Sequence, residues 1–223
     1  MRQYIKHVVP ATCLMLLVAC SHTPVSRQTP ATPVTEVSTT ETIGGPVASA
    51  PDINTIDPNI LQQYQQALTL MAAEKFDAAE KDFIRIMTAH SGLSGPYVNL
   101  GMIYMQTGRT GEAERAFEQA IERNPANVIA YNQLGILHRK AGRFDLALQF
   151  YKKALEIDPV YANAHLNLGI LYDLYLNQPE KALNEYKSYQ QLSVTEDKQV
   201  ELWIQDISIR INQTPEPSDS GQP

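Results

Sequence analysis

Cysteine and positive charge are both scarce in this chain of 223 residues. Its two cysteines are Cys13 and Cys20, and 24 aspartates and glutamates outnumber 18 lysines and arginines, so the formal net charge is −6. An acidic balance provides no basic field for holding a phosphate backbone. We therefore expect no nucleic-acid partner.

Motifs for catalysis and cofactor binding are also missing. There is no glycine-rich phosphate loop, and Ser91-Gly-Leu-Ser-Gly95 has the wrong spacing for a nucleophile elbow and no preceding strand. His138 and His165 occupy core-type positions without a cysteine or paired carboxylate to complete a metal site. We predict no enzyme activity, no cofactor and no metal; an unrecognised site involving these histidines is the alternative.

The apolar run near the N-terminus is too short for a membrane span. It covers residues 8–19 and follows the positive residues Arg2 and Lys6, whereas a bilayer span needs about 20 apolar residues. This length is typical of the apolar region of a signal peptide. The run ends in Leu17-Val18-Ala19-Cys20, which resembles a bacterial lipobox. The resemblance implies that residues 1–19 are a signal peptide and that Cys20 is lipidated, with palmitate among the acyl chains. An ordinary signal peptide with an accidental cysteine is the alternative.

The resemblance also has implications for location. In enterobacterial lipoproteins an aspartate after the lipidated cysteine favours the inner membrane, and here that residue is Ser21. Cys13 would be removed with the signal, so no intramolecular disulfide could form. We expect a lipid-anchored protein of the bacterial cell envelope, in the outer membrane and facing the periplasm.

Residues 20–56 are rich in Thr, Ser, Pro, Val and Ala and show no helical or strand period. Such a composition cannot bury enough apolar surface to offset its ordering entropy. We predict that this segment is a disordered tether. The Pro- and Ser-rich residues 213–223 are predicted to be a disordered tail.

Between these segments the sequence repeats with a period of 34 residues. Tyr97-Val-Asn-Leu-Gly101 matches Tyr131-Asn-Gln-Leu-Gly135, and further matches follow in the same register. Extending this register predicts four repeats, each of two helices with a Gly-containing break between them. They lie near residues 60–93, 94–127, 128–161 and 162–192, and the last carries a one-residue insertion.

This pattern resembles the tetratricopeptide repeat. The signature residues in the second repeat are Tyr97, Leu100, Gly101, Tyr104, Ala113, Phe117, Ala120 and Pro125. The resemblance implies an all-α solenoid over 57–192, with divergent first and fourth repeats that suit terminal positions. A further amphipathic segment, 193–212, carries Val200, Trp203 and Ile207 on one face. We predict that it caps the last repeat; a partner-binding helix is the alternative.

In this family the first helix of each repeat faces a groove, and the resemblance together with helical spacing places mainly amide and apolar residues there. The expected function is that of a membrane-anchored adaptor or assembly factor that binds a peptide or helix of a partner protein. Self-association as a structural subunit of an envelope complex, of the pilotin type or accessory to an energy-transducing complex, is the alternative. A solvated surface that binds no ligand is a further alternative. The expected groove residues are Tyr64, Leu68, Val98, Asn99, Met102, Asn132, Gln133, Ile136, Arg139, Leu166, Asn167 and Ile170.

Overall fold

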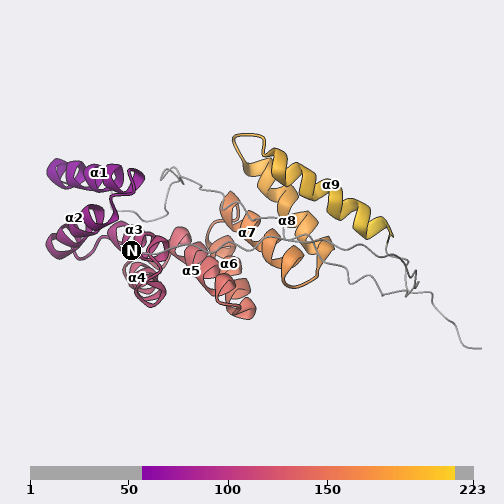
Figure 1. The fold of residues 1–223 in the computed structure, drawn as a ribbon, viewed down its shortest axis with the longest axis horizontal. Helices are drawn as coiled ribbons and strands as arrows, with labels where there is room; N and C mark the ends of the chain where they lie inside the picture. The colour runs from indigo at the N-terminus through magenta and orange to yellow at the C-terminus, as the bar shows by residue number, and fades with distance from the viewer. Residues whose placement is uncertain (1–56, 214–223) are drawn as a thin grey trace, which may run out of the picture. The chain divides into compact units, whose positions relative to one another are not determined.

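The computed structural model describes residues 57–213, which form nine α-helices and no strand (Figure 1). The predicted signal peptide with Cys20, the tether and nearly all of the tail lie outside the described residues. The helices are α1 (Pro58–Ala72), α2 (Phe76–Ala89), α3 (Gly95–Gln106), α4 (Thr110–Arg123), α5 (Val128–Lys140), α6 (Phe144–Ile157), α7 (Ala162–Leu174), α8 (Pro179–Leu192) and α9 (Lys198–Gln213).

The first eight helices form four pairs, α1/α2, α3/α4, α5/α6 and α7/α8, and the contacts within each pair are the most extensive ones. Each pair packs on the next. We call α1, α3, α5 and α7 the first helices and α2, α4, α6 and α8 the second helices. Among the first helices α3 contacts α5 and α5 contacts α7, whereas the second helices make no contact of comparable extent. The predicted all-α solenoid of four helix pairs is confirmed.

Small residues allow the two helices of a pair to approach closely. A Cβ atom added at Gly101 would lie well inside van der Waals distance of the Phe117 ring, and Gly135 has the same relation to Tyr151. Gly169 and Tyr186 repeat this contact in the fourth pair. The glycine is therefore required by an aromatic ring in the partner helix rather than by backbone conformation, because all three glycines are helical.

The turn inside each pair also repeats, including where the sequence does not show it. Gly108 and Gly142 have positive φ angles of 75° and 73°. At the equivalent places in the first and fourth pairs, Glu74 and Asn177 have φ angles of 56° and 50°. Left-handed backbone is unfavourable for residues with a Cβ. The terminal repeats therefore keep the same turn with residues less suited to it.

Side-chain caps mark three of the described helix starts, and at α5 the Asn127 side chain accepts from the amide of Ala130 at 3.0 Å. Asp57 accepts a hydrogen bond from the amide of Asn59 at 2.9 Å, and Pro58 occupies the first helical position. The last helix begins later than the predicted 193. Asp197 accepts hydrogen bonds from the amides of Gln199 and Val200 at 3.0 and 3.2 Å, so its carboxylate fixes the helix start near Lys198.

Helix α9 covers the open side of the fourth pair. Val200 and Ile207 are buried, and the Trp203 ring lies 5.4 Å from the Tyr186 ring between centroids. Arg210 donates to Asp173 of α7 at 2.7 Å. The predicted capping helix is therefore present and packs on α8 and α7 through both apolar and ionic contacts.

Candidate protein-interaction surface

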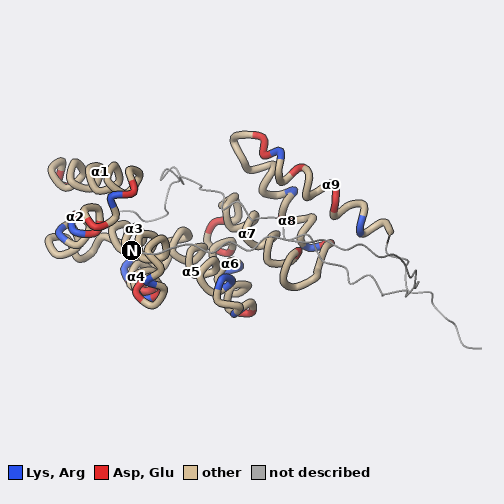
Figure 2. Tube along the Cα trace, in the orientation of Figure 1, with Lys and Arg blue, Asp and Glu red and all other residues tan. Residues whose placement is uncertain are grey.

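Charge is divided unequally between the two sets of helices (Figure 2). The four first helices contain three charged residues, Arg139, Lys140 and Asp173, whereas every second helix carries several. Asp173 is in addition paired with Arg210. The side formed by the first helices, which we call the first-helix face, is therefore the least charged part of the solenoid.

The structure corrects the placement of five expected groove residues. Asn132 is fully buried, and Asn99 is 2% exposed. The reason is the packing of the first helices on one another, which covers side chains that helical spacing alone assigns to the open face. The five residues that are buried rather than groove-lining are Val98, Asn99, Asn132, Gln133 and Leu166.

Asn99 and Asn167 occupy equivalent positions and make equivalent contacts between neighbouring first helices. The Asn99 amide donates to the Tyr64 hydroxyl of the preceding repeat and to the carbonyl of Gly95. Asn167 donates in the same way to Asn132, at 3.1 Å, and to the carbonyl of Asn163. Burial raises the pKa of Tyr64 to about 12, so its hydroxyl stays protonated. These amides connect repeats, a role that nothing in the sequence pattern indicated.

The expected residues that remain accessible form a row with one side chain per repeat. Leu68, Met102, Ile136 and Ile170 occupy equivalent positions and are all half-buried, with part of each side chain reaching solvent. Asn167 is half-buried as well. The accessible first-helix face is therefore an apolar row, with the amides mostly beneath it.

A second row changes character along the solenoid. Its members are Met71 and Met105 in the first two repeats, then Arg139 and Asp173, all half-buried. The Arg139 guanidinium donates to the Tyr151 hydroxyl at 3.3 Å and lies 5.8 Å from the centre of the Tyr175 ring. Burial raises the pKa of Tyr151 to about 12. The face is therefore apolar in its first half and carries charge in its second.

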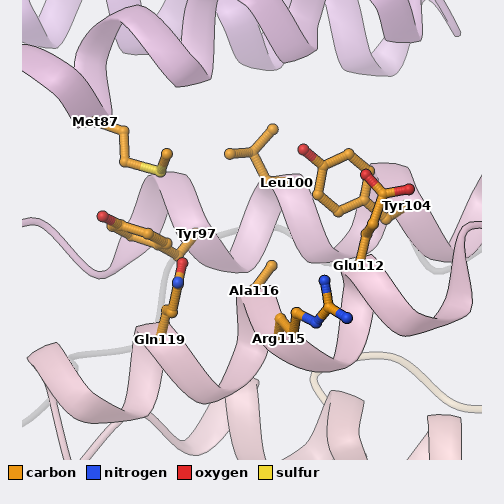
Figure 3. A pocket seen from close by; sticks show the side chains of 8 residues that line it. All are labelled: Met87, Tyr97, Leu100, Tyr104, Glu112, Arg115, Ala116 and Gln119. Atoms are coloured by element: carbon orange, nitrogen blue, oxygen red, sulfur yellow. The ribbon is translucent and has the colours of Figure 1, made fainter.

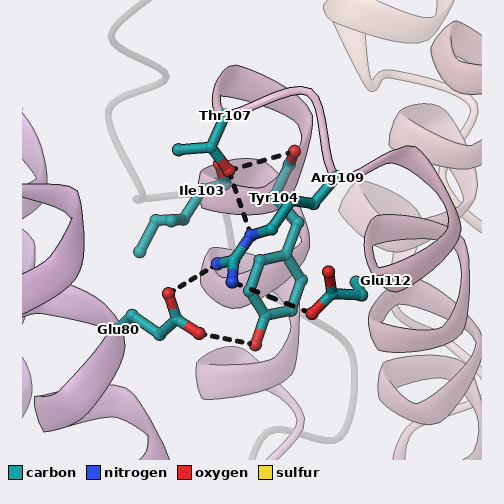
Figure 4. A network of polar contacts seen from close by, with 6 residues as sticks. All are labelled: Glu80, Ile103, Tyr104, Thr107, Arg109 and Glu112. Carbon is teal, nitrogen blue, oxygen red and sulfur yellow. Dashed lines mark hydrogen bonds and ion pairs between the residues drawn. The ribbon is translucent and has the colours of Figure 1, made fainter.

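Ion pairs join the repeats away from this face (Figure 4). Arg109, in the turn after α3, pairs with Glu80 of α2, and the Tyr104 hydroxyl donates to the same carboxylate at 3.2 Å. One repeat later Arg143 pairs with Glu114 at 3.3 Å. We call the packing of α1/α2 on α3/α4 the first junction and that of α3/α4 on α5/α6 the second junction. Each is closed by an arginine from the same turn position.

His138 and His165, the two histidines considered above for a metal or catalytic site, each contact a different set of residues. His138 is buried, stacks on Phe150 with 5.0 Å between ring centroids, and accepts from the Arg143 guanidinium at 2.7 Å. His165 lies 2.7 Å from a Glu185 carboxylate oxygen and 3.0 Å from the carbonyl of Pro159. Across residues 57–213, no three His, Cys, Asp or Glu side chains are grouped to hold a metal ion.

The comparisons with known proteins agree with this geometry. Residues 98–162 and 150–184 each match a family model described as tetratricopeptide repeat. The fold is a tetratricopeptide-repeat solenoid. Such solenoids typically use their extended surfaces for protein–protein binding. No curated protein matches the sequence.

Several solved structures share the fold at low sequence identity. PilF of Pseudomonas aeruginosa is similar with a TM-score of 0.63 and 16% identity, over 69% of this chain and 69% of that one. A thermophilic tetratricopeptide-repeat protein of Thermus thermophilus gives 0.57 and 21%, over 68% and 82%. A MamA segment from Desulfovibrio magneticus gives 0.57 and 17%, over 70% and 87%. At these identities the likeness establishes the fold alone.

None of the described helices is long and apolar enough to cross a membrane.

Proposed function

We propose that this protein is a lipid-anchored adaptor or assembly factor of the bacterial cell envelope, which binds a peptide or helix of a partner protein on the first-helix face. The observation that carries the proposal is the row formed by Leu68, Met102, Ile136 and Ile170 on a face with little charge. An amphipathic partner helix or an extended peptide could cover such a row with regularly spaced apolar side chains.

The anchor strengthens this binding without adding a contact. A lipid at Cys20 would confine the solenoid to the membrane surface and raise its local concentration near envelope partners. The Leu17-Val18-Ala19-Cys20 motif supports this part of the proposal. Replacing Cys20 with Ser should move the protein from the membrane fraction to the soluble fraction, and an unchanged distribution would contradict the anchor.

The binding face has a separate test. The triple variant Met102→Ser, Ile136→Ser, Ile170→Ser should keep its helical circular dichroism but lose the partners that wild type crosslinks in intact envelopes. The matched control is Ile84→Ser, Val160→Ser, Val194→Ser, which removes three apolar side chains that are exposed elsewhere. Partners that survive in the first variant would refute the proposed face.

Self-association is a second candidate, favoured by one observation on α9. Leu202 and Ile209 are 58% and 55% exposed and lie seven residues apart, on the side of the helix that does not cover α8. Light scattering should then show an oligomer in wild type that dissociates in Leu202→Ser, Ile209→Ser. A wild-type protein that is monomeric at all concentrations rules this candidate out.

A further inference from the structure

One of the positions on the second helices that differ in every repeat lies next to the first helices. Counting by the repeat register, with the insertion in the fourth repeat, it is Asp82, Ala116, Phe150 and Glu185. In three repeats the side chain has a partner from a first helix. Asp82 accepts from Gln66 at 3.3 Å, Phe150 stacks on His138, and Glu185 is bonded to His165.

Ala116 is the exception, because its methyl group is buried against Leu100 and Ile103 of α3 but offers neither a hydrogen bond nor a ring to a first helix. An open pocket of about 180 Å³ lies beside it, between α2 and α4 (Figure 3). The sides are formed by Tyr97 and Tyr104, which match Tyr131 and His138 of the next repeat. Those are the two rings that Phe150 contacts, with centroid distances of 6.4 and 5.0 Å. The first junction therefore lacks an aromatic ring that the second junction contains.

The edge of the pocket is polar and comes from α4. Glu112, Arg115 and Gln119 line it (Figure 3). Arg115 is exposed, and no ion pair is formed by its guanidinium within residues 57–213. Glu112 by contrast lies 3.8 Å from Arg109. The free charge at this edge is therefore positive, and it complements a carboxylate.

We propose that the pocket between α2 and α4 binds a phenylalanine-type side chain of a partner protein that carries a carboxylate close to the ring. The ring would take the place that Phe150 occupies in the second junction, between Tyr97 and Tyr104, and the carboxylate would pair with Arg115. Offset and edge-to-face contacts with two aromatic rings favour an aromatic occupant over an aliphatic one. This site is separate from the first-helix face and does not depend on the proposed function.

The sequence disfavours an occupant from the protein's own terminal segments. Outside residues 57–213 the chain contains one Phe, Tyr or Trp, namely Tyr4 in the predicted signal peptide. A second copy could offer Tyr175, which is 41% exposed. Occupation by a second copy would depend on protein concentration, which the test below measures.

The test uses N-acetylphenylalanine as the probe, because it combines the ring with a carboxylate. In the full-length chain, the NMR signal of the Ala116 methyl group should shift saturably with the probe and show contacts to its ring protons. N-acetylalanine should have no effect. Ala116→Phe, which copies Phe150, should abolish the response, and Arg115→Glu should weaken it roughly tenfold. Lys152→Glu, the same charge change on α6, should leave it unchanged.

Several results would overturn the proposal. They are an absence of saturable shifts, equal shifts with N-acetylalanine, or a response that persists in Ala116→Phe. An Ala116 signal that depends on protein concentration without probe would assign the pocket to a second copy. If Ala116→Phe fails to fold, the decision passes to Arg115→Glu, whose altered side chain is exposed, and unchanged affinity there refutes the carboxylate contact.

Discussion

The first and second junctions use the same scaffold but differ in what fills them. The pairs α3/α4 and α5/α6 each contain a tight glycine–aromatic contact and a left-handed glycine turn, and an arginine–glutamate pair from equivalent positions joins each of them to the preceding pair. In the second junction a phenyl ring stacks on a histidine, whereas in the first an alanine leaves a pocket between two tyrosines. Residues that repeat therefore build the solenoid, and the few that do not repeat give each junction its own chemistry.

The largest effect is expected at the scaffold itself. Phe117→Ala and Tyr151→Ala each remove a fully buried ring from the same position of successive repeats. Each should lower the free energy of unfolding by roughly 3–5 kcal/mol, through lost burial and the cavity left behind. Urea denaturation measures both. Costs that differ by more than about 1.5 kcal/mol would show that the two repeats do not share one scaffold.

A smaller effect is expected where the junctions differ. Phe150→Ala converts the second junction into a copy of the first and should cost about 2 kcal/mol, because the ring is half-buried and stacks on His138. Ala116→Phe makes the reverse change and should raise the melting temperature. A fall in melting temperature for Ala116→Phe would mean that the first junction has closed around its alanine.

The repeated positions were predictable because a period is visible in one sequence without any knowledge of contacts. Gly101 and its copies, the helix pairs and the capping role of α9 all follow from spacing. The exposure of Asn99 and Asn132 was predicted wrongly, because helical spacing describes one helix and their burial comes from its neighbour. The pocket beside Ala116 was missed for the same reason, since an alanine is conspicuous only when the ring at Phe150 is known to fill the equivalent space.

The arginines that close the junctions should contribute less. Arg109→Ala should cost about 0.5–1 kcal/mol, because the guanidinium is partly shielded, pairs with Glu80 and lies 4.1 Å from the centre of the Tyr104 ring. The part of the cost that salt screens should be smaller for Arg143→Ala, since both its side chain and that of Glu114 are more exposed, whereas its hydrogen bond to the buried His138 adds a cost that salt does not remove. Urea denaturation at low and high salt tests the order. If the salt-dependent loss in the free energy of unfolding were larger for Arg143→Ala than for Arg109→Ala, the stronger ion pair would lie in the second junction and not in the first.

The terminal turns offer a change in the opposite direction. Glu74→Gly should stabilise the protein by roughly 0.5 kcal/mol, because relief of the left-handed backbone outweighs the added entropy of the unfolded chain. Asn177→Gly should gain less, since asparagine tolerates this conformation better. Thermal melts compare the two. Destabilisation by Glu74→Gly would show that the glutamate side chain contributes more than its backbone costs.

The smallest effects depend on pH and separate the second junction from the fourth repeat. Burial, assisted by Arg143 and opposed by Glu114, lowers the pKa of His138 below its ordinary value of 6.5. The hydrogen bond to Glu185, opposed by burial, raises the pKa of His165 above 6.5. The folded state therefore binds a proton less readily than the unfolded chain at His138 and more readily at His165.

These shifts have opposite consequences for stability. The contribution of His138 is lost as pH falls below 6.5 towards its folded pKa, whereas that of His165 is complete below 6.5 and lost as pH rises through its folded pKa. When the pH is lowered from about 7.5 to about 5.5, the free energy of unfolding should therefore fall less in His138→Gln than in wild type. In His165→Gln it should fall more than in wild type. NMR titration of the two imidazoles gives the direction independently. Tyr104 occupies the place of His138 in the first junction, and its pKa is raised above 10.0. The stability of the first junction should therefore not change over this pH range. A change in the protonation of Tyr104 between these pH values would contradict the difference between the two junctions.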